Sequence, residues 1–258
     1  MDRISNLFNQ KNSNILSVYF CAGAPLADNT AEVITTLSDK GIDMIEIGIP
    51  FSDPMADGPV IQEAATTAIR NGMSLRKLLK QLDGIRDKVS IPLILMGYLN
   101  PVIQYGLEEF FSCCNRIGID GVIIPDLPFN EYMENVKPIS EKYNIKVIML
   151  ITPETSDERI RQIDSQTSGF IYMVSSAAVT GTQKDFNSAK LDYFKRIDAM
   201  KLNNNRMIGF GISNKPTFEA AAKYSSGCIV GSLFVNLLKE TNGDAGKAAD
   251  LMLEKLNQ

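Results

Sequence analysis

Three acidic side chains, Glu46, Asp53 and Asp57, stand close together in the sequence, and carboxyl groups are the main candidates for acid–base chemistry in this chain. The chain contains no histidine, so it has no imidazole base, no Ser-His or Cys-His dyad and no imidazole metal ligand. Proton transfer near neutral pH must therefore be carried by carboxylates, Lys, Tyr or Cys.

Glu46 lies within Met44–Ile49, where three isoleucines alternate with Met44, Glu46 and Gly48. Because side chains alternate along a strand, the isoleucines are expected on the helix-covered face of a sheet and Glu46 on the other face. Burial there would raise the pKa of the carboxyl, which suits a group that must both donate and accept a proton. A structural glutamate held by a buried partner is the alternative interpretation.

Asp53 and Asp57 lie in the following loop, Pro50–Pro59, which contains three prolines. Aspartates in such sequences commonly stabilise turns through hydrogen bonds to the backbone. A loop stiffened by proline can also hold a carboxylate over a binding site. The residues of the loop leave both roles open.

The elements that position these acids follow a repeated pattern, in which short apolar runs alternate with segments of helical period. Strands are predicted at Ile15–Ala22, Met44–Ile49, Ile91–Met96, Gly121–Ile124, Lys146–Ile151, Phe170–Val174, Arg206–Phe210 and Cys228–Val230. Helices are predicted at Thr30–Lys40, Ile61–Arg70, Ser74–Lys88, Leu107–Ile117, Glu131–Tyr143, Asp157–Gln166, Leu191–Lys201, Pro216–Tyr224, Leu233–Glu240 and Ala245–Leu256. Ser74 and Asp157 are the expected N-caps.

Eight strand–helix units in 258 residues predict an α/β fold, a single (β/α)8 TIM barrel with its site at the C-terminal ends of the strands. No linker divides the chain, so residues 1–258 are expected to form one barrel domain. An open doubly wound sheet is the alternative, but it does not need eight units, and no G-x-G-x-x-G follows the first strand. In a barrel, Glu46 would point into the interior.

Composition restricts the class of protein. Hydrophobic residues make up 45% and charged residues 22% of the chain, which excludes a disordered protein. No apolar run approaches the roughly 20 residues that span a bilayer, and Met1–Asn6 lacks the apolar segment of a signal peptide. The net charge of −4 argues against a nucleic acid as the main partner. Cys21, Cys113, Cys114 and Cys228 have no zinc spacing and are expected as reduced thiols in a cytoplasmic protein.

Glycines end the last two predicted strands, in Gly209–Ser213 and Gly227–Ser232. Glycine lets a backbone approach a phosphate closely, and barrels often bind phosphate after strands seven and eight. Neither loop contains Arg or Lys, so backbone N–H groups and the Ser232 hydroxyl are the expected ligands. Ordinary strand-end glycines are the alternative.

The sixth loop, Ser175–Lys184, is long, polar and rich in small residues, which fits either a mobile lid or a plain surface loop.

A longer pattern connects these features. The segment Glu46–Gln62, EIGIPFSDPMADGPVIQ, resembles the signature of the tryptophan synthase α subunit. The resemblance covers nearly the whole chain and reappears at Met96–Pro101, Ile123–Pro128, Val179–Gly181, Gly209–Ser213 and Gly231–Ser232. It implies a (β/α)8 barrel lyase of tryptophan biosynthesis that cleaves indole-3-glycerol phosphate into indole and glyceraldehyde 3-phosphate.

The resemblance also implies a role for each matching residue. Glu46 and Asp57 correspond to the two catalytic acids. The phosphate residues map onto Gly181, Gly211, Gly231 and Ser232, and Thr180 would contact Asp57 when the lid closes. The residues expected to surround the flat indole ring are Tyr19, Tyr98, Ile123, Tyr172 and Phe210, for which core packing is the alternative.

The implied chemistry is a retro-aldol cleavage without metal or cofactor in this chain. Glu46 would protonate indole C3 and then take the side-chain hydroxyl proton, while ionised Asp57 stabilises positive charge at the ring N–H. Two departures stand out: Ala178 and Ala24 replace residues that are commonly Gly and an acid in the family. A different lid geometry and the loss of a minor loop contact are the expected consequences.

The resemblance further implies an α2β2 heterotetramer with a pyridoxal-phosphate β subunit, which docks on the barrel mouth near Asp53 and Asp126. Two other functions remain open at this stage. One is a noncatalytic barrel that only activates a partner synthase, although retention of Glu46 and Asp57 argues against it. The other is a phosphosugar barrel enzyme acting on a related indole or ribulose phosphate.

Overall fold

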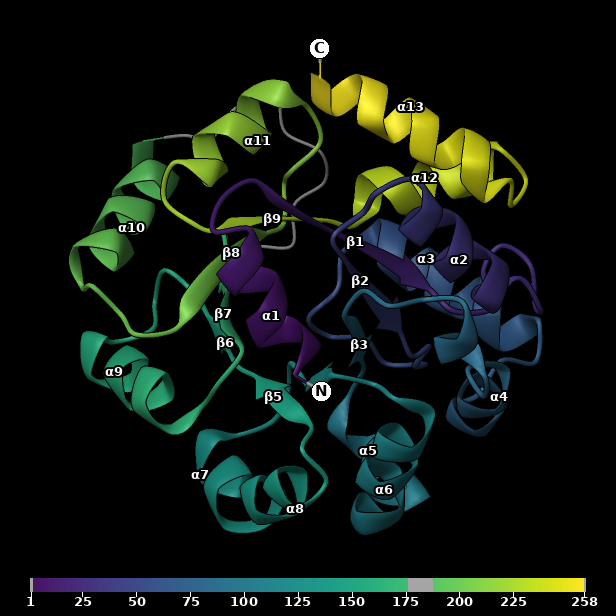
Figure 1. Cartoon of the computed structure of the whole chain (residues 1–258), viewed down its shortest axis with the longest axis horizontal. Helices are drawn as coiled ribbons and strands as arrows, with labels where there is room; N and C mark the ends of the chain where they lie inside the picture. Colours follow the sequence, from purple (N-terminus) through teal and green to yellow (C-terminus); the bar gives the residue numbers. More distant parts are fainter. Residues whose placement is uncertain (1, 176–187, 258) are drawn as a thin grey trace.

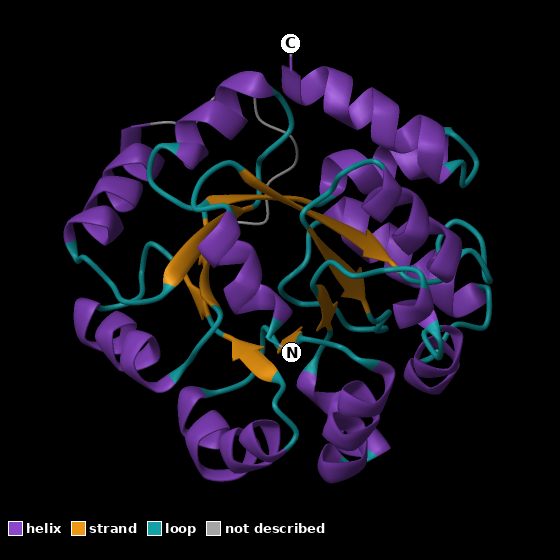
Figure 2. Cartoon of the chain, in the orientation of Figure 1, coloured by secondary structure: helices purple, strands orange, loops and turns teal. Residues whose placement is uncertain are grey.

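The structure is a computed structural model that describes residues 2–175 and 188–257. Its strands are β1 (Ile15–Cys21), β2 (Met44–Gly48), β3 (Leu93–Met96), β4 (Gly121–Ile123), β5 (Lys146–Ile148), β6 (Leu150–Ile151), β7 (Phe170–Val174), β8 (Asn205–Gly209) and β9 (Gly227–Val230). Every pairing between them is parallel. Figure 2 shows the strands as a ring surrounded by helices.

The ring closes between the first and last strands and also through β5 and β6. β1 pairs with both β2 and β9, and the strand order is β5-β4-β3-β2-β1-β9-β8-β7-β6. Only Met149 separates β5 from β6, and its carbonyl accepts a hydrogen bond of 3.0 Å from the Tyr172 N–H of β7. β5 and β6 are therefore two parts of the one predicted strand Lys146–Ile151, and the predicted eight-stranded barrel is confirmed.

The helices lie around the outside of the barrel, except the first, which crosses one end of it (Figure 1). They are α1 (Arg3–Gln10), α2 (Thr30–Asp39), α3 (Pro59–Arg70), α4 (Leu75–Gln81), α5 (Leu99–Tyr105), α6 (Leu107–Ile117), α7 (Phe129–Glu131), α8 (Lys137–Lys142), α9 (Asp157–Gln166), α10 (Ser188–Ala199), α11 (Lys215–Ala222), α12 (Ser232–Glu240) and α13 (Ala245–Asn257). A π-helical turn at Tyr132–Val136 joins α7 to α8. In the described ranges, no helix has the length and apolar character needed to cross a membrane.

Several predicted helix boundaries were wrong. Ser74 caps α4 as predicted, by accepting a hydrogen bond from the Lys77 N–H. α4 nevertheless ends at Gln81, not Lys88, because Gly84 adopts a left-handed conformation (φ 80°) that a helix cannot continue through. The N-cap of α9 is Ser156 rather than Asp157, since the Ser156 side chain accepts from the Arg159 N–H.

α1 and α5 were not predicted at all. α1 crosses the end of the barrel at which the strands begin (Figure 1). Its Ile4 and Phe8 are buried, and the Phe8 ring lies 6.0 Å from that of Phe170 at the start of β7. α1 therefore covers the N-terminal end of the barrel and leaves the other end as the only open mouth among the described residues.

A buried aspartate, Asp120, ties this closed end together. Its carboxylate accepts hydrogen bonds from Arg3 of α1 (3.0 Å), from Arg86 and from the Leu93 N–H that opens β3 (2.9 Å). Two cations and a backbone donor offset the cost of burying the charge. These contacts lie opposite the mouth and belong to the stability of the barrel.

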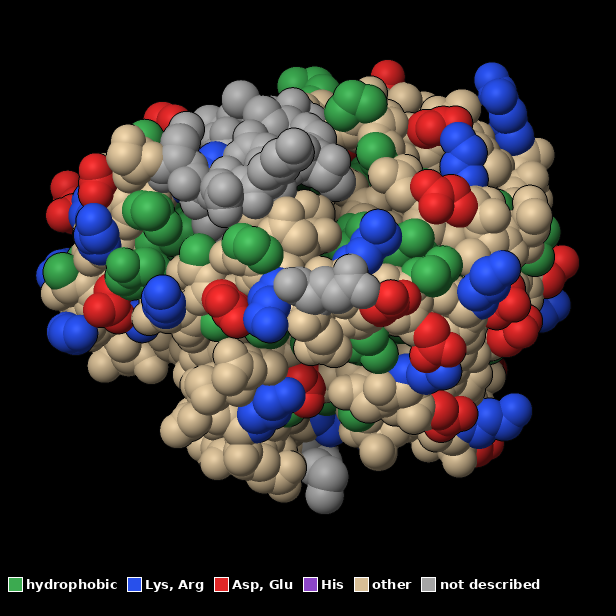
Figure 3. All heavy atoms as spheres, turned by 90° about the horizontal axis from the view of Figure 1, so that it is seen from above, with side chains coloured by type: hydrophobic (Ala, Val, Ile, Leu, Met, Phe, Trp, Pro, Cys, Tyr) green, Lys and Arg blue, Asp and Glu red, His purple; other side chains and the backbone are tan. Residues whose placement is uncertain are grey.

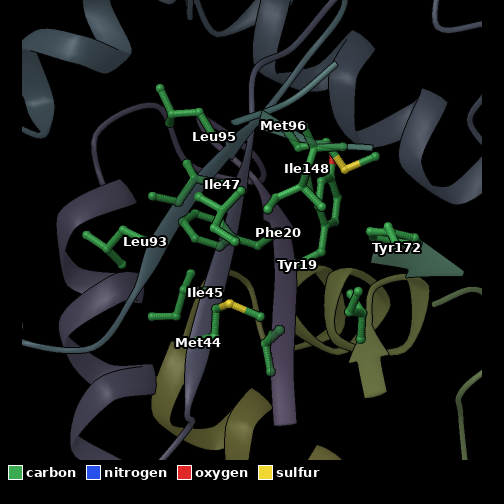
Figure 4. Packing of buried hydrophobic residues seen from close by; sticks show 14 of the residues in the cluster. Tyr19, Phe20, Met44, Ile45, Ile47, Leu93, Leu95, Met96, Ile148 and Tyr172 are labelled. Atoms are coloured by element: carbon green, nitrogen blue, oxygen red, sulfur yellow. The ribbon is translucent and has the colours of Figure 1, made fainter. Parts of the chain in front are cut away.

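The alternation of side chains divides the core into two layers. In Figure 4, Ile45, Ile47 and Leu93 lie on one side of their strands, and Tyr19 and Met96 lie on the other. All five residues of β2 are buried, because one face packs on helices and the other fills the barrel. Figure 3 shows a face on which basic and acidic side chains are interspersed, in keeping with the small net charge.

Candidate active site

Glu46 lies at the centre of β2 with its side chain inside the barrel. It pairs in register with Tyr19 of β1 and Ile94 of β3, and it is fully buried. The Ser17 hydroxyl donates a hydrogen bond of 3.2 Å to Glu46 Oε1, whereas Oε2 has no partner in the described part of the chain. Burial raises the pKa of Glu46 from 4.5 to about 8, and the hydrogen bond from Ser17 opposes that rise. The side chain lies inside the barrel as predicted, and the pKa shifts in the predicted direction.

Two tyrosines share the interior with Glu46. Tyr19 lies over Gly48, where an added Cβ would come within 2.2 Å of its hydroxyl oxygen, and Tyr172 lies over Gly209 of β8 at the same distance. Burial, together with the charges of Glu46 and Asp57, raises the pKa of both tyrosines well above its ordinary value. Both rings are therefore neutral and form flat, mostly apolar walls.

Asp57 enters the site from the loop between β2 and α3, just before Pro59 begins that helix. The Tyr98 hydroxyl donates a hydrogen bond of 2.8 Å to Asp57 Oδ2 and itself accepts one of 2.9 Å from the Ala56 N–H. Burial raises the pKa of Asp57, and the bond from Tyr98 opposes the rise. Asp57 is thus an oriented acid of the site. Asp53, by contrast, is exposed and is bonded to the neighbouring Ser52 hydroxyl.

Asp126 supports this arrangement indirectly. Its Oδ1 accepts a hydrogen bond of 2.8 Å from the Leu99 N–H, at the first residue of α5. That bond anchors the start of the helix directly after Tyr98, whose ring also stacks on Phe51 at 5.2 Å. Asp126 therefore holds the backbone next to the tyrosine that orients Asp57.

A pocket opens at the C-terminal ends of the strands, beside Asp57. Its lining residues come from β1, β3, β7, β9 and the segments after β2, β8 and β9. They are Tyr19, Asp57, Ile61, Met96, Tyr172, Phe210, Gly211, Ile212, Ser213, Ile229, Gly231, Ser232 and Leu233. Glu46 does not line the pocket itself, although Tyr19, its register partner, and Tyr172 do.

The far side of the pocket is built from backbone. Phe210 and Gly211 both have positive φ angles, 69° and 82°, and the first is unusual for a residue with a side chain. Gly231 precedes α12, and Ser232 is the first residue of that helix, so the first turn, whose leading N–H groups have no partner within the helix, begins in the pocket lining. The nearest described atoms to a Cβ built on Gly231 belong to Tyr19, at 3.8 Å. A Cβ at Gly231 would therefore meet the Tyr19 side chain at ordinary van der Waals distance.

The structure brings most of the predicted site residues together. Tyr19, Tyr172, Phe210, Gly211, Gly231 and Ser232 line one pocket with Asp57, and Tyr98 bonds to Asp57 from outside that lining. Ile123 is fully buried in β4 and does not reach the pocket. Thr180, Gly181 and Ala178 lie outside the described residues.

Sequence reasoning missed six of the lining residues: Ile61, Met96, Ile212, Ser213, Ile229 and Leu233. Five of them are apolar, and in a sequence they are indistinguishable from core residues. Ser213 is the last residue of the glycine-containing segment Gly209–Ser213, and that position is the one signal that could have identified it.

The described residues contain no group of three or more His, Cys, Asp or Glu side chains placed to hold a metal ion. A closed parallel barrel with a buried, weakly acidic glutamate and a backbone-lined pocket at its mouth defines an enzyme of the (β/α)8 class acting on a small anionic substrate.

Comparison with known proteins gives the family. The family model for the tryptophan synthase alpha chain matches residues 5–258. The tryptophan synthase alpha chain of Phocaeicola vulgatus is 62% identical over 256 residues, 99% of each chain, and that of Parabacteroides distasonis is 60% identical over the full length of both. A crystal structure of tryptophan synthase subunit alpha from Legionella pneumophila superposes with a TM-score of 0.88 at 32% identity, covering 100% of this chain and 98% of that one.

The chain belongs to the tryptophan synthase alpha chain family. It is a lyase that cleaves indole-3-glycerol phosphate in tryptophan biosynthesis. The expected family and fold are confirmed, and the two other functions considered above are set aside.

Proposed function

We propose that Glu46 is the proton shuttle of this cleavage. The observation that carries the proposal is a fully buried carboxyl with a pKa of about 8 and one oxygen without a partner among the described residues. Such a group is mostly protonated at neutral pH, yet it loses its proton at little cost, so it can act as acid and then as base.

Glu46 carries out both proton transfers of the proposed reaction. Glu46 gives its proton to indole C3, which makes the ring a cationic, electron-accepting leaving group. The bond between C3 and the glycerol side chain then breaks as the adjacent hydroxyl returns a proton to Glu46 and becomes the aldehyde of glyceraldehyde 3-phosphate. Indole leaves, and Glu46 is protonated again.

We assign Asp57 to the positive charge that develops on the protonated ring. The Tyr98 hydroxyl, which itself accepts a hydrogen bond from the Ala56 N–H, donates to this carboxylate and orients it beside the pocket. A carboxylate that is already oriented needs little rearrangement as charge develops at the ring N–H. Tyr19, Tyr172 and Phe210 supply the rings that sandwich the indole. Tyr98 acts through its bond to Asp57, and Ile123 lies outside the pocket lining.

The phosphate would bind at the backbone-lined side of the pocket, to Gly211, Gly231 and Ser232. Gly211 has a positive φ angle and α12 begins in the pocket lining, so the backbone N–H groups at these two places would be the donors. The family resemblance adds Gly181 to this set and assigns Thr180 to contact with Asp57.

Replacing Ser232 with Ala should raise the KM for indole-3-glycerol phosphate about tenfold and leave kcat nearly unchanged. The reason is that a hydrogen bond to a charged phosphate is lost equally from the ground and transition states. Steady-state kinetics check it. Ser156→Ala is the matched control, because it removes a serine at the start of α9, should cost about 1 kcal/mol of stability and should leave KM unchanged. A Ser232→Ala enzyme with normal KM would remove Ser232 from the phosphate site.

A β subunit is the proposed partner, in an α2β2 heterotetramer. One similar structure, at 31% identity and a TM-score of 0.85, is that of a tryptophan synthase complex from Pyrococcus furiosus. Met55 is 89% exposed in the loop that carries Asp53 and Asp57, and Ile103 of α5 is 53% exposed. Exposed apolar side chains near the mouth suit a surface that is covered in an assembly. Pyridoxal phosphate would be held by the β subunit, and this chain would need no cofactor.

Indole release from indole-3-glycerol phosphate, measured with and without the β subunit, tests the proposed assembly. We expect turnover by the chain alone and faster turnover in the complex. A β subunit that neither co-purifies with the chain nor changes its turnover would contradict the partner assignment.

Two broader proposals complete the assignment. Residues 1–258 would act as one barrel domain, which is supported by pairing of β1 with both β2 and β9. A cytoplasmic location is supported by the four cysteines, all of which are free thiols.

A further inference from the structure

Ser17 is a small polar residue in the mostly apolar interior of the barrel. It lies in β1 among Ile15, Leu16 and Val18, and it is completely buried. Its hydroxyl donates to Glu46 Oε1 at 3.2 Å, across 29 residues of sequence. A buried hydroxyl destabilises a core unless it is hydrogen-bonded, so this contact accounts for a serine at this position.

The strand register fixes the side from which Ser17 approaches. Tyr19 pairs with Glu46, and Ser17 pairs with Met44, two residues earlier along β2. Ser17 therefore lies one interior position closer to the closed end of the barrel, the end that α1 covers. Oε1 is held from that end, and Oε2 is the oxygen left without a partner in the described residues.

We propose that Ser17 is a positioning residue for Glu46, whose hydroxyl occupies Oε1 from the closed end so that Oε2 carries the transferred proton. This inference rests on the proposed role of Glu46 as proton shuttle. A protonated carboxyl can place its hydrogen on either oxygen. A donor fixed at Oε1 makes that oxygen the acceptor and leaves the O–H on Oε2, the oxygen that has no partner among the described residues.

The same hydrogen bond adjusts the acidity of Glu46. A donor stabilises the carboxylate more than the neutral acid, so it lowers the pKa that burial alone would produce. No other described group lowers the pKa of Glu46. The titratable groups that face it are Tyr19 of β1 and Tyr172 of β7, with Asp57 near both rings at the mouth. Neither tyrosine carries a charge near neutral pH.

Replacing Ser17 with Ala should move the alkaline limb of the kcat/KM profile upward by about one pH unit. The sign follows from the first step, which needs protonated Glu46. Activity falls as pH rises through the pKa of the free enzyme, and losing the donor raises that pKa. Ser17→Cys should behave like Ser17→Ala, because a thiol is a weak donor, whereas Ser17→Thr keeps the hydroxyl and should restore the wild-type limb.

The carboxyl should also be titrated directly, so that the result does not depend on turnover. Infrared difference spectra of the full chain against pH report the protonated carboxyl, and Glu46→Gln identifies its band. We expect the midpoint of that band to rise in Ser17→Ala by the same amount as the kinetic limb. Ser140→Ala is the matched control, since it removes a buried hydroxyl of α8 that donates to the Lys137 carbonyl, far from the barrel interior.

The possible outcomes separate the two assignments. If the Glu46 band and the kinetic limb both move, the inference holds. If neither moves in a folded Ser17→Ala chain, Ser17 does not position Glu46, and the inference is overturned. If Glu46→Gln cleaves the substrate at a normal rate, the proposed shuttle is wrong. The infrared band of Glu46 then still shows whether Ser17 affects the pKa of that carboxyl.

Discussion

Glu46→Gln should lower kcat for indole release by about 1,000-fold, because the amide can neither give a proton to indole C3 nor take one from the hydroxyl. The Gln side chain is close in size to Glu, so binding of indole-3-glycerol phosphate should change much less, and KM should stay within a few-fold of wild type. Single-turnover measurement of indole release checks this directly. Glu63→Gln, the same change at an exposed glutamate paired with Lys239, is the control and should have wild-type kinetics. A Glu46→Gln chain with near-normal kcat would end the shuttle assignment.

Urea unfolding of Glu46→Gln, measured at several pH values, tests whether this variant remains folded. The pKa of Glu46 is raised by folding, from 4.5 to about 8, so the folded state holds a proton that the unfolded state releases over that range. The favourable contribution of the neutral side chain is fully present below pH 4.5 and is lost as pH rises through about 8. Glu46→Gln stays neutral at every pH, so it should be more resistant to urea than wild type at alkaline pH.

Asp57→Asn should lower kcat by about 100-fold and raise KM by a smaller factor. The carboxylate charge is needed chiefly when positive charge develops on the protonated ring, so its loss affects the transition state more than the bound substrate. The amide can still accept the hydrogen bond from Tyr98, which should preserve the loop. The kcat and KM of the purified variant measure the two effects separately.

Asp53→Asn is the matched control for Asp57→Asn. It makes the same change in the same loop, at an exposed side chain whose described bond is to Ser52. The chain alone should keep its kcat, although assembly with a β subunit is expected to weaken. An Asp57→Asn chain with unchanged kcat would exclude Asp57 from the mechanism.

The barrel could be predicted because each of its strands shows a pattern among neighbouring residues in the sequence. A strand buried on both faces appears as a short apolar run, and alternation within Met44–Ile49 places Glu46 opposite the isoleucines. That argument gave the interior position of Glu46 without coordinates, and burial gave the direction of its pKa. The helices α1 and α5 escaped prediction, because each is short and the packing that stabilises it involves residues far away in the chain.

What the sequence by itself determined is the eight repeated units, the interior glutamate and the glycines at the ends of the last strands, each of which follows from the order of neighbouring residues. Tertiary structure alone decided which groups touch the two acids. Ser17 meets Glu46 across 29 residues and Tyr98 meets Asp57 across 41, while Phe210 adopts its positive φ in the wall of the pocket. Such contacts depend on strand register and loop closure, which are set by the packing of the whole barrel and leave no pattern in the residues beside them.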